Sequence, residues 1–221
     1  MARMARVVVP DIPHHITQRG NRRQSVFFSD ADKAEYIHFL KEEATKNKVL
    51  IWAWCLMDNH VHFVAVPSTE ESLAKVFGDT HKRYTRRINF REKWRGYLWQ
   101  GRFSSFPMDE PYLLSAVRYV ERNPVEAGIV SRAEDYSWSS AKAHVHGTSD
   151  PLLSPSFLDE RIQDWSAYLC ISDENQTKRL IRHSKTGRPM GDDRFLRKLE
   201  QFTGRVLQKA KPGPRSHVGI K

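Results

Sequence analysis

Two histidines, His60 and His62, are separated by one residue in a segment with the composition of a β-strand. Side chains two positions apart on a strand project from the same face, so both imidazoles can bind one divalent cation while Val61 and Phe63 pack on the other face. An isolated pair with this spacing is more often part of a solvent-facing strand than of a metal site. Further residues must therefore decide between the two interpretations.

Other histidine pairs in the chain do not share this geometry. His144 and His146 have the same spacing but follow a segment typical of a helix, where residues two apart point about 200° from each other. We therefore assign that pair to the surface. His14 and His15 are adjacent and would point to opposite faces of a strand, so at most one of them can face a site.

A tyrosine supplies a candidate nucleophile. Leu113, Val117 and Val120 cluster on one face of a predicted helix, and Tyr119 lies away from the centre of that face. Asn123, one turn further on, shares its stripe and offers an amide oxygen. Together with two imidazoles, a phenol and an oxygen ligand could form a metal-assisted nucleophilic site. The alternative is an amphipathic tyrosine that packs under a loop.

Several segments together resemble a known family. His60-Val61-His62 is similar to the HUH motif, and Tyr119 followed by Asn123-Pro124 resembles the nucleophile helix of single-tyrosine HUH transposases. Further segments resemble the REP-associated tyrosine transposases, which carry an IS200-like transposase domain: the opening stretch 12–21, the stretch 99–103 and the basic end of the chain. The resemblance covers about residues 6–150 and is looser beyond residue 155.

The resemblance implies a metal-dependent single-stranded DNA endonuclease and strand-transferase. His60, His62 and Asn123 would hold Mg²⁺ or Mn²⁺, and Tyr119 would attack the scissile phosphate to form a 5′-phosphotyrosine intermediate at repetitive palindromic hairpins. One alternative is a non-catalytic DNA-binding regulator that retains the fold. Another is a zinc hydrolase, which usually needs a third nitrogen or carboxylate ligand, such as Asp58.

Basic residues provide candidate contacts to single-stranded or hairpin DNA. In the resembled family the N-terminal region helps to read a short single-stranded tag, and Gln18, Arg19, Arg22 and Arg23 occupy that region here. On a predicted helix, Lys82, Arg83, Arg86 and Arg87 recur on one face, where they could follow phosphates or simply form a solvated surface. Arg102 could also reach DNA, whereas Trp99 and Phe103 are expected in the core.

The elements that must position these residues follow from periodicity. We expect strands at 15–19, 49–57, 61–66 and 97–106, with a hairpin between the second and third. Helices are expected at about 30–47, from 69 through Arg87, and at 109–122, where Asn123-Pro124 would end the helix and start a short second one. This order predicts an α+β, ferredoxin-like sandwich with an antiparallel sheet.

The charge is concentrated at the end of the chain. The 221 residues contain 36 Lys+Arg and 26 Asp+Glu, for a formal charge of +10. Residues 178–221 hold 13 of these basic and 3 of these acidic residues, so the remainder is neutral overall. We predict a catalytic domain over 1–154 and a helical, basic DNA-binding extension over 155–221, with helices near 159–171 and 192–202 and a basic segment at 209–215.

Composition also excludes several classes. The longest apolar run has nine residues, too few for a transmembrane helix, and no export signal is visible, so we expect a cytoplasmic protein without a membrane partner. Two distant cysteines indicate neither a disulfide framework nor a zinc finger. No glycine-rich phosphate loop follows a strand, so no nucleotide cofactor is expected. We expect a monomer rather than a dimer.

Overall fold

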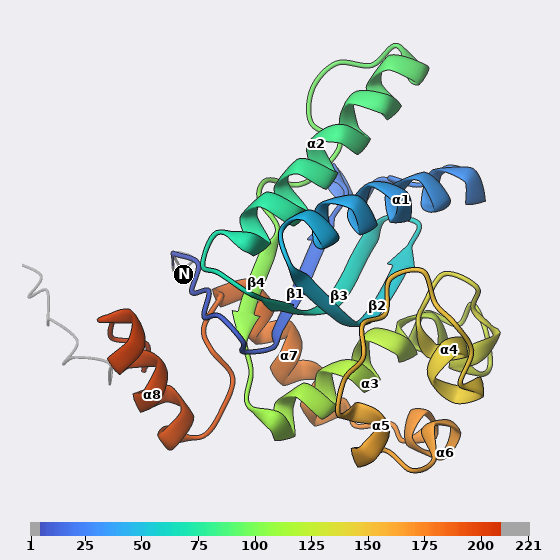
Figure 1. The fold of residues 1–221 in the computed structure, drawn as a ribbon. Coiled ribbons are helices and arrows are strands. Elements are labelled where there is room, and N and C mark those ends of the chain that lie inside the picture. Colours follow the sequence, from blue (N-terminus) through green and yellow to red (C-terminus); the bar gives the residue numbers. More distant parts are fainter. Residues whose placement is uncertain (1–4, 209–221) are drawn as a thin grey trace, which may run out of the picture.

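Four antiparallel strands form the centre of the computed structural model, which describes residues 5–208 (Figure 1). The sheet order is β2-β3-β1-β4, with β1 at His14–Arg19, β2 at Val49–Met57, β3 at His60–Pro67 and β4 at Ser104–Pro107. Helix α1 (Asp30–Lys46) connects β1 to β2, and α2 (Ser72–Glu92) connects β3 to β4. This is the predicted ferredoxin-like arrangement, and the fold prediction is confirmed.

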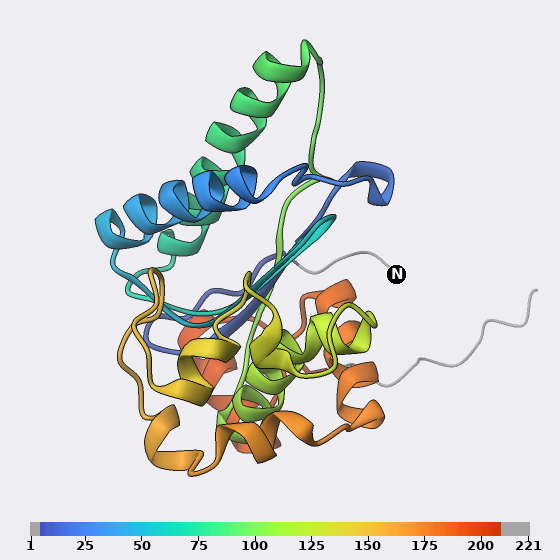
Figure 2. The same cartoon turned by 90° about the vertical axis from the view of Figure 1, so that its right-hand side faces the viewer.

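Helices cover both faces of the sheet (Figure 2). Helices α1 and α2 lie on one face, where Phe63 and Ala65 of β3 join the first hydrophobic core. Helices α3 (Glu110–Glu126) and α7 (Glu174–Thr186) lie on the other face, where Val64 and Phe106 join the second core. The alternation along β3 therefore sends His60 and His62 to the α3 side of the sheet.

The helix starts follow from their capping residues. The side chain of Ser29 accepts a hydrogen bond from the backbone N–H of Asp32 and caps α1. The side chain of Asp109 caps α3 in the same way by accepting from Tyr112. Both caps satisfy backbone donors that a helix start leaves unpaired.

The remaining elements are short and lie mostly in the second half of the chain. They are η1 (Asn21–Arg23), η2 (Ala133–Asp135), α4 (Ala141–His146), α5 (Leu158–Arg161), α6 (Trp165–Cys170) and α8 (Asp193–Thr203). No helix within residues 5–208 has the length and apolar composition needed to cross a membrane.

In the second half of the chain, one prediction was wrong and one helix was missed. The single helix expected near 159–171 is divided into α5 and α6, because Ile162 is extended and Asp164 caps a new helix. Helix α7 was not predicted at all. Only Leu180 is fully buried along it, so its sequence shows little of the apolar periodicity that identifies a packed helix.

The predicted end of the third helix at Asn123 was also wrong. Helix α3 continues through Pro124 to Glu126, and no second helix starts there. Pro124 lies one turn after Val120 and is buried with it, so apolar contact compensates for the missing N–H of the proline near the helix end. Asn123 thereby remains on the same helix as Tyr119.

The strand expected at 97–106 is much shorter than predicted. Only Ser104–Pro107 form β4, and the chain from 93 to 103 is a loop that is held beside β1 by a bridge between Gly20 and Trp99 and by a hydrogen bond from the backbone of Gln100 to the carbonyl of Arg19. Gly101 has a φ of 65°, which is incompatible with a regular strand. Trp99 and Phe103 are nevertheless in the core, as expected.

His144 is not a surface residue, contrary to our expectation. It lies on α4, as predicted, but its ring stacks on Trp165 at a centroid distance of 4.0 Å, and its Nδ1 lies 2.7 Å from Oε1 of the fully buried Glu121. Ser140 donates a hydrogen bond to the same carboxylate oxygen. His146 is exposed, so the expectation holds for that member of the pair.

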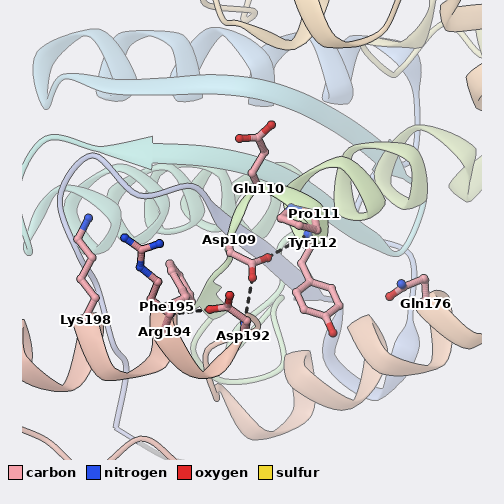
Figure 3. Close-up of a pocket in the computed structure, with 9 residues that line it drawn as sticks. All are labelled: Asp109, Glu110, Pro111, Tyr112, Gln176, Asp192, Arg194, Phe195 and Lys198. Carbon is pink, nitrogen blue, oxygen red and sulfur yellow. Dashed lines mark hydrogen bonds between the residues drawn. The ribbon is translucent and has the colours of Figure 1, made fainter.

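Helix α8 is joined to α3 through the caps of both helices (Figure 3). Asp109 Oδ2 accepts a hydrogen bond from the backbone of Asp192 at 2.9 Å, and Asp192 in turn caps α8 by accepting from Phe195. A Cβ on Gly191 would lie 2.2 Å from the Phe195 ring, so only glycine fits at this junction. A cavity of about 670 Å³ remains between the two helix starts.

Residues beyond 155 contribute directly to the core of the sheet. Leu158, Leu180 and Met190 belong to the same buried cluster as Val64 and Phe106. The division at residue 154 stays a prediction about function, since both sides of it share one core. The basic segment expected at 209–215 lies outside the described residues.

The Glu121–His144 pair predicts a pH-dependent stability. Burial alone would lower the pKa of His144, but the charge and hydrogen bond of Glu121, with Asp159 and Asp150 nearby, raise it above 6.5. The stabilisation from this pair is therefore complete below about pH 6.5 and declines as pH rises through the raised value. We expect Glu121→Gln to lower the free energy of unfolding by roughly 2–3 kcal/mol at pH 6.

Urea unfolding of both proteins at pH 6 and pH 9 measures this effect. The gap between the two proteins should narrow at pH 9. Buried His14 and His81, with pKa values lowered by burial to about 4 and about 3, have the opposite pH dependence but are present in both proteins. A gap of the same size at both pH values would show that charge on His144 does not stabilise the fold.

Candidate active site

Strand register brings the site residues onto one face of the sheet. In the antiparallel pairing of β1 with β3, Arg19 lies opposite His60, and Thr17 lies opposite His62. The rings of His60 and His62 have centroids 5.0 Å apart. His15, two residues before Thr17, lies on the same face, while His14 points to the other side, where it binds backbone near the N-terminus. One of the two adjacent histidines therefore faces the site, as expected.

Hydrogen bonds define the orientation of His60. Asn59 donates its amide N–H to the carbonyl of Arg23, which leaves its Oδ1 2.6 Å from His60 Nδ1, so that this nitrogen carries the proton. Burial and the charge of Arg19 lower the pKa of His60 to about 4, so the ring is neutral at pH 7. Its Nε2 therefore presents a lone pair.

The lone pair on Nε2 of His60 faces a lone pair on Oδ1 of Asn123. Asn123 donates its amide N–H to the carbonyl of Tyr119 at 3.0 Å, which turns its Oδ1 toward His60 Nε2 at 3.3 Å. Neither atom can donate a hydrogen bond to the other. Two acceptors held this close repel each other unless a cation lies between them.

A chain of hydrogen bonds orients His62. Its Nδ1 lies 3.1 Å from Nε2 of the buried His15, and Nδ1 of His15 lies 3.3 Å from the hydroxyl of Ser184 on α7. If Nδ1 of each ring donates, the chain is complete and His62 Nε2 keeps its lone pair. That Nε2 is buried and has no hydrogen-bond partner among the described residues. Such outer partners commonly hold a metal-binding histidine in its tautomer.

Tyr119 packs directly against these histidines. Its ring centroid lies 5.3 Å from that of His62 and 5.9 Å from that of His15, in edge-to-face contacts. Burial raises the pKa of the Tyr119 hydroxyl above 10, although a hydrogen bond from Asn123 and the charge of Arg19 oppose the shift. The phenol is therefore protonated at neutral pH and needs a further positive charge to become a nucleophile.

The donor atoms fit a divalent cation. Nε2 of His60, Nε2 of His62 and Oδ1 of Asn123 are unprotonated donors without a protein donor to satisfy them. Within residues 5–208, no three His, Cys, Asp or Glu side chains gather as a metal site, so a third ligand must be of another type, as the amide of Asn123 is. Asp58, the alternative ligand of a zinc hydrolase, is exposed and pairs with Lys33 at 2.8 Å.

A cavity of about 260 Å³ opens over this constellation. Sequence analysis did not predict six of its lining residues. Thr17 comes from β1, Gln100 from the loop before β4 and Ser104 from β4, and Ile181, Ser184 and Lys185 come from the unpredicted α7. Sequence analysis also left the role of His15 open. The full lining comprises Thr17, Gln18, Arg19, His62, Gln100, Arg102, Ser104, Tyr119, Ile181, Ser184 and Lys185.

The residues predicted to bind DNA occupy several places. Gln18, Arg19 and Arg102 line the cavity beside Tyr119, although Gln18 is buried and donates to the carbonyls of Gln100 and Gly101. Arg22 and Arg23 are exposed on η1, both with positive φ.

The basic row of α2 is divided between two surroundings. Arg83 pairs with Glu42 and Glu43, and Arg87 pairs with Glu35, all on α1. Lys82 and Arg86 instead line a separate groove beside the loop that precedes β4. Arg83, Arg86 and Arg87 also line one hollow on α2 together with Phe90 and Arg91, so Arg86 borders both surroundings.

Comparison with known proteins supports this assignment of the fold. Residues 8–123 match the family described as "Transposase IS200 like". No curated protein matches the chain. A solved REP-associated tyrosine transposase bound to a REP hairpin is similar at a TM-score of 0.57 and 19% identity, over 71% of this chain and 93% of that one. A putative transposase from Deinococcus radiodurans R1 gives a TM-score of 0.39 and 17% identity over 55% and 97%.

The family match spans more than half of the chain, and it includes both histidines of the His60-Val61-His62 segment, Tyr119 and Asn123. It confirms the resemblance that the motifs predicted, at the level of the family. The chain belongs to the IS200-like transposase family.

Proposed function

We propose that this protein is a metal-dependent single-stranded DNA endonuclease and strand-transferase that acts at palindromic hairpins through Tyr119. The observation that carries the proposal is the contact of Tyr119 with two neutral histidines, together with the lone pairs of His60 and Asn123 that face each other at 3.3 Å. The hairpin substrate is proposed because the REP-associated transposase with the same fold was solved with a REP hairpin.

In the proposed reaction, His60, His62 and Asn123 hold Mg²⁺ or Mn²⁺. The bound cation would polarise the scissile phosphate and stabilise the charge that develops on it. Tyr119 loses its proton, its Oη forms a bond to phosphorus, and the bond from phosphorus to the 3′-oxygen breaks. The 3′-oxygen takes up a proton, leaving a 5′-phosphotyrosine and a free 3′-hydroxyl. Attack by another 3′-hydroxyl reverses the step and joins two strands.

The described residues of one chain supply every group in this scheme. We therefore propose that a monomer suffices for the chemistry. We further propose that the part of the chain after residue 154 has two roles: α7 supports His62 through Ser184, and the basic end beyond α8 adds affinity for DNA.

The nucleophile is tested with hairpin oligonucleotides labelled at the 3′ end, because the 5′-phosphate of that fragment would become attached to Tyr119. Wild-type protein should form a covalent adduct on a denaturing gel with Mg²⁺ or Mn²⁺, and Tyr119→Phe should reduce it by roughly 10³-fold or more. Tyr119→Phe should still bind DNA, since only the hydroxyl is removed.

Tyr112→Phe is the matched control, because Tyr112 lies two turns earlier on α3 and outside the cavity. It should form the adduct at the wild-type rate. If wild-type protein binds hairpins but forms no adduct, the chain is a DNA-binding regulator. Loss of binding together with the adduct in Tyr119→Phe would assign that tyrosine a structural role.

Metal binding is tested separately from catalysis by titrating Mn²⁺ and following the free ion by electron paramagnetic resonance. His60→Ala and Asn123→Ala should each weaken Mn²⁺ binding by at least about tenfold, because each removes a direct ligand. His15→Ala should weaken it by about 10- to 100-fold, because the hydrogen bond that orients His62 is removed.

His146→Ala is the control for this titration, since His146 has the same His-x-His spacing but is exposed on a helix. Its affinity for Mn²⁺ should equal that of wild type. Unchanged affinity in Asn123→Ala would remove the amide from the ligand set.

The basic end is tested by removing residues 209–221, which contain Lys209, Lys211, Arg215 and Lys221. This truncation leaves the buried residues of α7 and α8 in place. The slope of log affinity against log salt concentration should fall by about 0.7 for each phosphate that these cations neutralise in the full-length protein. Adduct formation at saturating DNA should be unchanged, and an unaltered salt slope would show that these cations do not contact DNA.

A further inference from the structure

A second groove lies between α2 and the loop that precedes β4. Its volume is about 620 Å³. Among the described residues, its lining contains basic side chains but no acidic one, together with several aromatic rings. The residues used below are Lys82, Arg86, Tyr97, Trp99 and Arg102. Charge and composition together therefore suit an anionic ligand that also has a flat ring.

Tyr97 is exposed on a firmly held segment of backbone. Its side chain is 86% exposed, and it makes no hydrogen bond or ring contact within residues 5–208. The carbonyls on both sides are fixed, since Asn89 donates to Gly96 at 3.0 Å and the backbone of Asn21 donates to Leu98 at 2.8 Å. Nothing in the fold requires an aromatic ring here, and the backbone presents it in a fixed place.

Two cations of this groove, Lys82 and Arg86, are not neutralised by neighbouring acids. They lie one turn apart on α2, and they form no ion pair among the described residues. The adjacent Arg83 and Arg87 pair with carboxylates of α1. The acids of α1 thus neutralise one side of α2 and leave the groove side positive.

Trp99 adds an unsatisfied donor. Trp99 is 6% exposed and lines the groove, and its ring makes a tilted contact with His81 at a centroid distance of 4.6 Å. Its Nε1–H has no hydrogen-bond partner among the described residues. A buried donor without an acceptor is costly, so the fold keeps this indole at the groove despite an unmade hydrogen bond.

The groove and the catalytic cavity meet at one residue. Arg102 lines both of them, and Gly101 and Gln100, which precede it, are held by the side chain of Gln18 on β1. A DNA strand that contacts Arg102 in the cavity beside Tyr119 would therefore also be next to the groove.

We propose that this groove binds an unpaired nucleotide of the DNA strand, with its base stacked on Tyr97 and its phosphate held by Lys82 and Arg86. The inference rests on the proposed function for its substrate, but it assigns a separate site with no part in the bond cleavage. An acidic peptide would use the two cations but would have no need of an exposed ring.

The test measures binding of fluorescein-labelled (dA)₁₀ and (dT)₁₀ to the full-length protein by fluorescence anisotropy, without cleavage. Tyr97→Ala should weaken binding roughly 5- to 100-fold, as expected when one stacked base loses its partner, and Tyr97→Phe should stay within about twofold of wild type. Lys82→Ala should lower the salt slope by about 0.7.

Phe202→Ala is the matched control, because Phe202 is an exposed aromatic residue of α8 that lines neither this groove nor the basic hollow of Arg83, Arg86 and Arg87. It should bind as wild type. The proposal is overturned if Tyr97→Ala binds as wild type, if Phe202→Ala weakens binding as much as Tyr97→Ala, or if a ten-residue poly-glutamate peptide binds as tightly as the oligonucleotides and with the same response to Tyr97→Ala.

The same variants separate this proposal from the proposed function. Tyr119→Phe should bind the oligonucleotides normally, and Tyr97→Ala should still form the covalent adduct at saturating hairpin DNA. Adduct formation without any effect of Tyr97→Ala on affinity would refute the groove alone. An effect of Tyr97→Ala on affinity without an adduct in wild type would support the groove and refute the endonuclease.

Discussion

The pairing register of β1 with β3 is the constraint on which the site depends. It places Arg19 opposite His60 and Thr17 opposite His62, and it brings His15 to the face that carries both histidines. Because side chains alternate along a strand, a slip of one residue would turn His15 away from the site and move Ile16 to the face that carries His60 and His62. The buried Ile16, which packs on the opposite face, opposes such a slip. The hydrophobic core therefore fixes the position of the chemical groups.

Burial sets the protonation of the site once the register is fixed. His15 and His62 lie under α3 and α7, where desolvation lowers the pKa of each imidazole and keeps both neutral. Neutral imidazoles have lone pairs, which a metal ligand requires. The same burial raises the pKa of Tyr119, so the environment that keeps the imidazoles neutral also keeps the phenol protonated. A positive charge bound by the neutral imidazoles would lower the pKa of the Tyr119 phenol and favour its ionised form.

The sequence was informative where local pattern determines structure. Alternation along 60–66 identified the strand and the shared face of His60 and His62, and helical spacing placed Asn123 one turn after Tyr119. It failed where tertiary contact decides. Pro124 remains helical because it is buried, α7 has too few apolar residues to be recognised, and the loop before β4 is shaped by its contacts with β1. Ser184 and Tyr97 could not be recognised as candidate site residues until the fold placed α7 beside the cavity and this loop beside the groove.

The charge pattern of the sequence was also incomplete as a guide to DNA binding, because tertiary contacts decide which basic residues are paired. A basic row on α2 suggested one DNA-binding face, but pairing with the acids of α1 divides it into a neutralised side and a positive groove. The distinction matters for a tyrosine transesterification. The covalent bond would hold only the 5′-phosphate fragment, whereas the fragment with the free 3′-hydroxyl would be retained only by noncovalent contacts. Rejoining therefore depends on affinity that survives cleavage, because a bound fragment has a high effective concentration at the site. A positive groove that shares Arg102 with the cavity beside Tyr119 would supply such affinity without taking part in the bond cleavage.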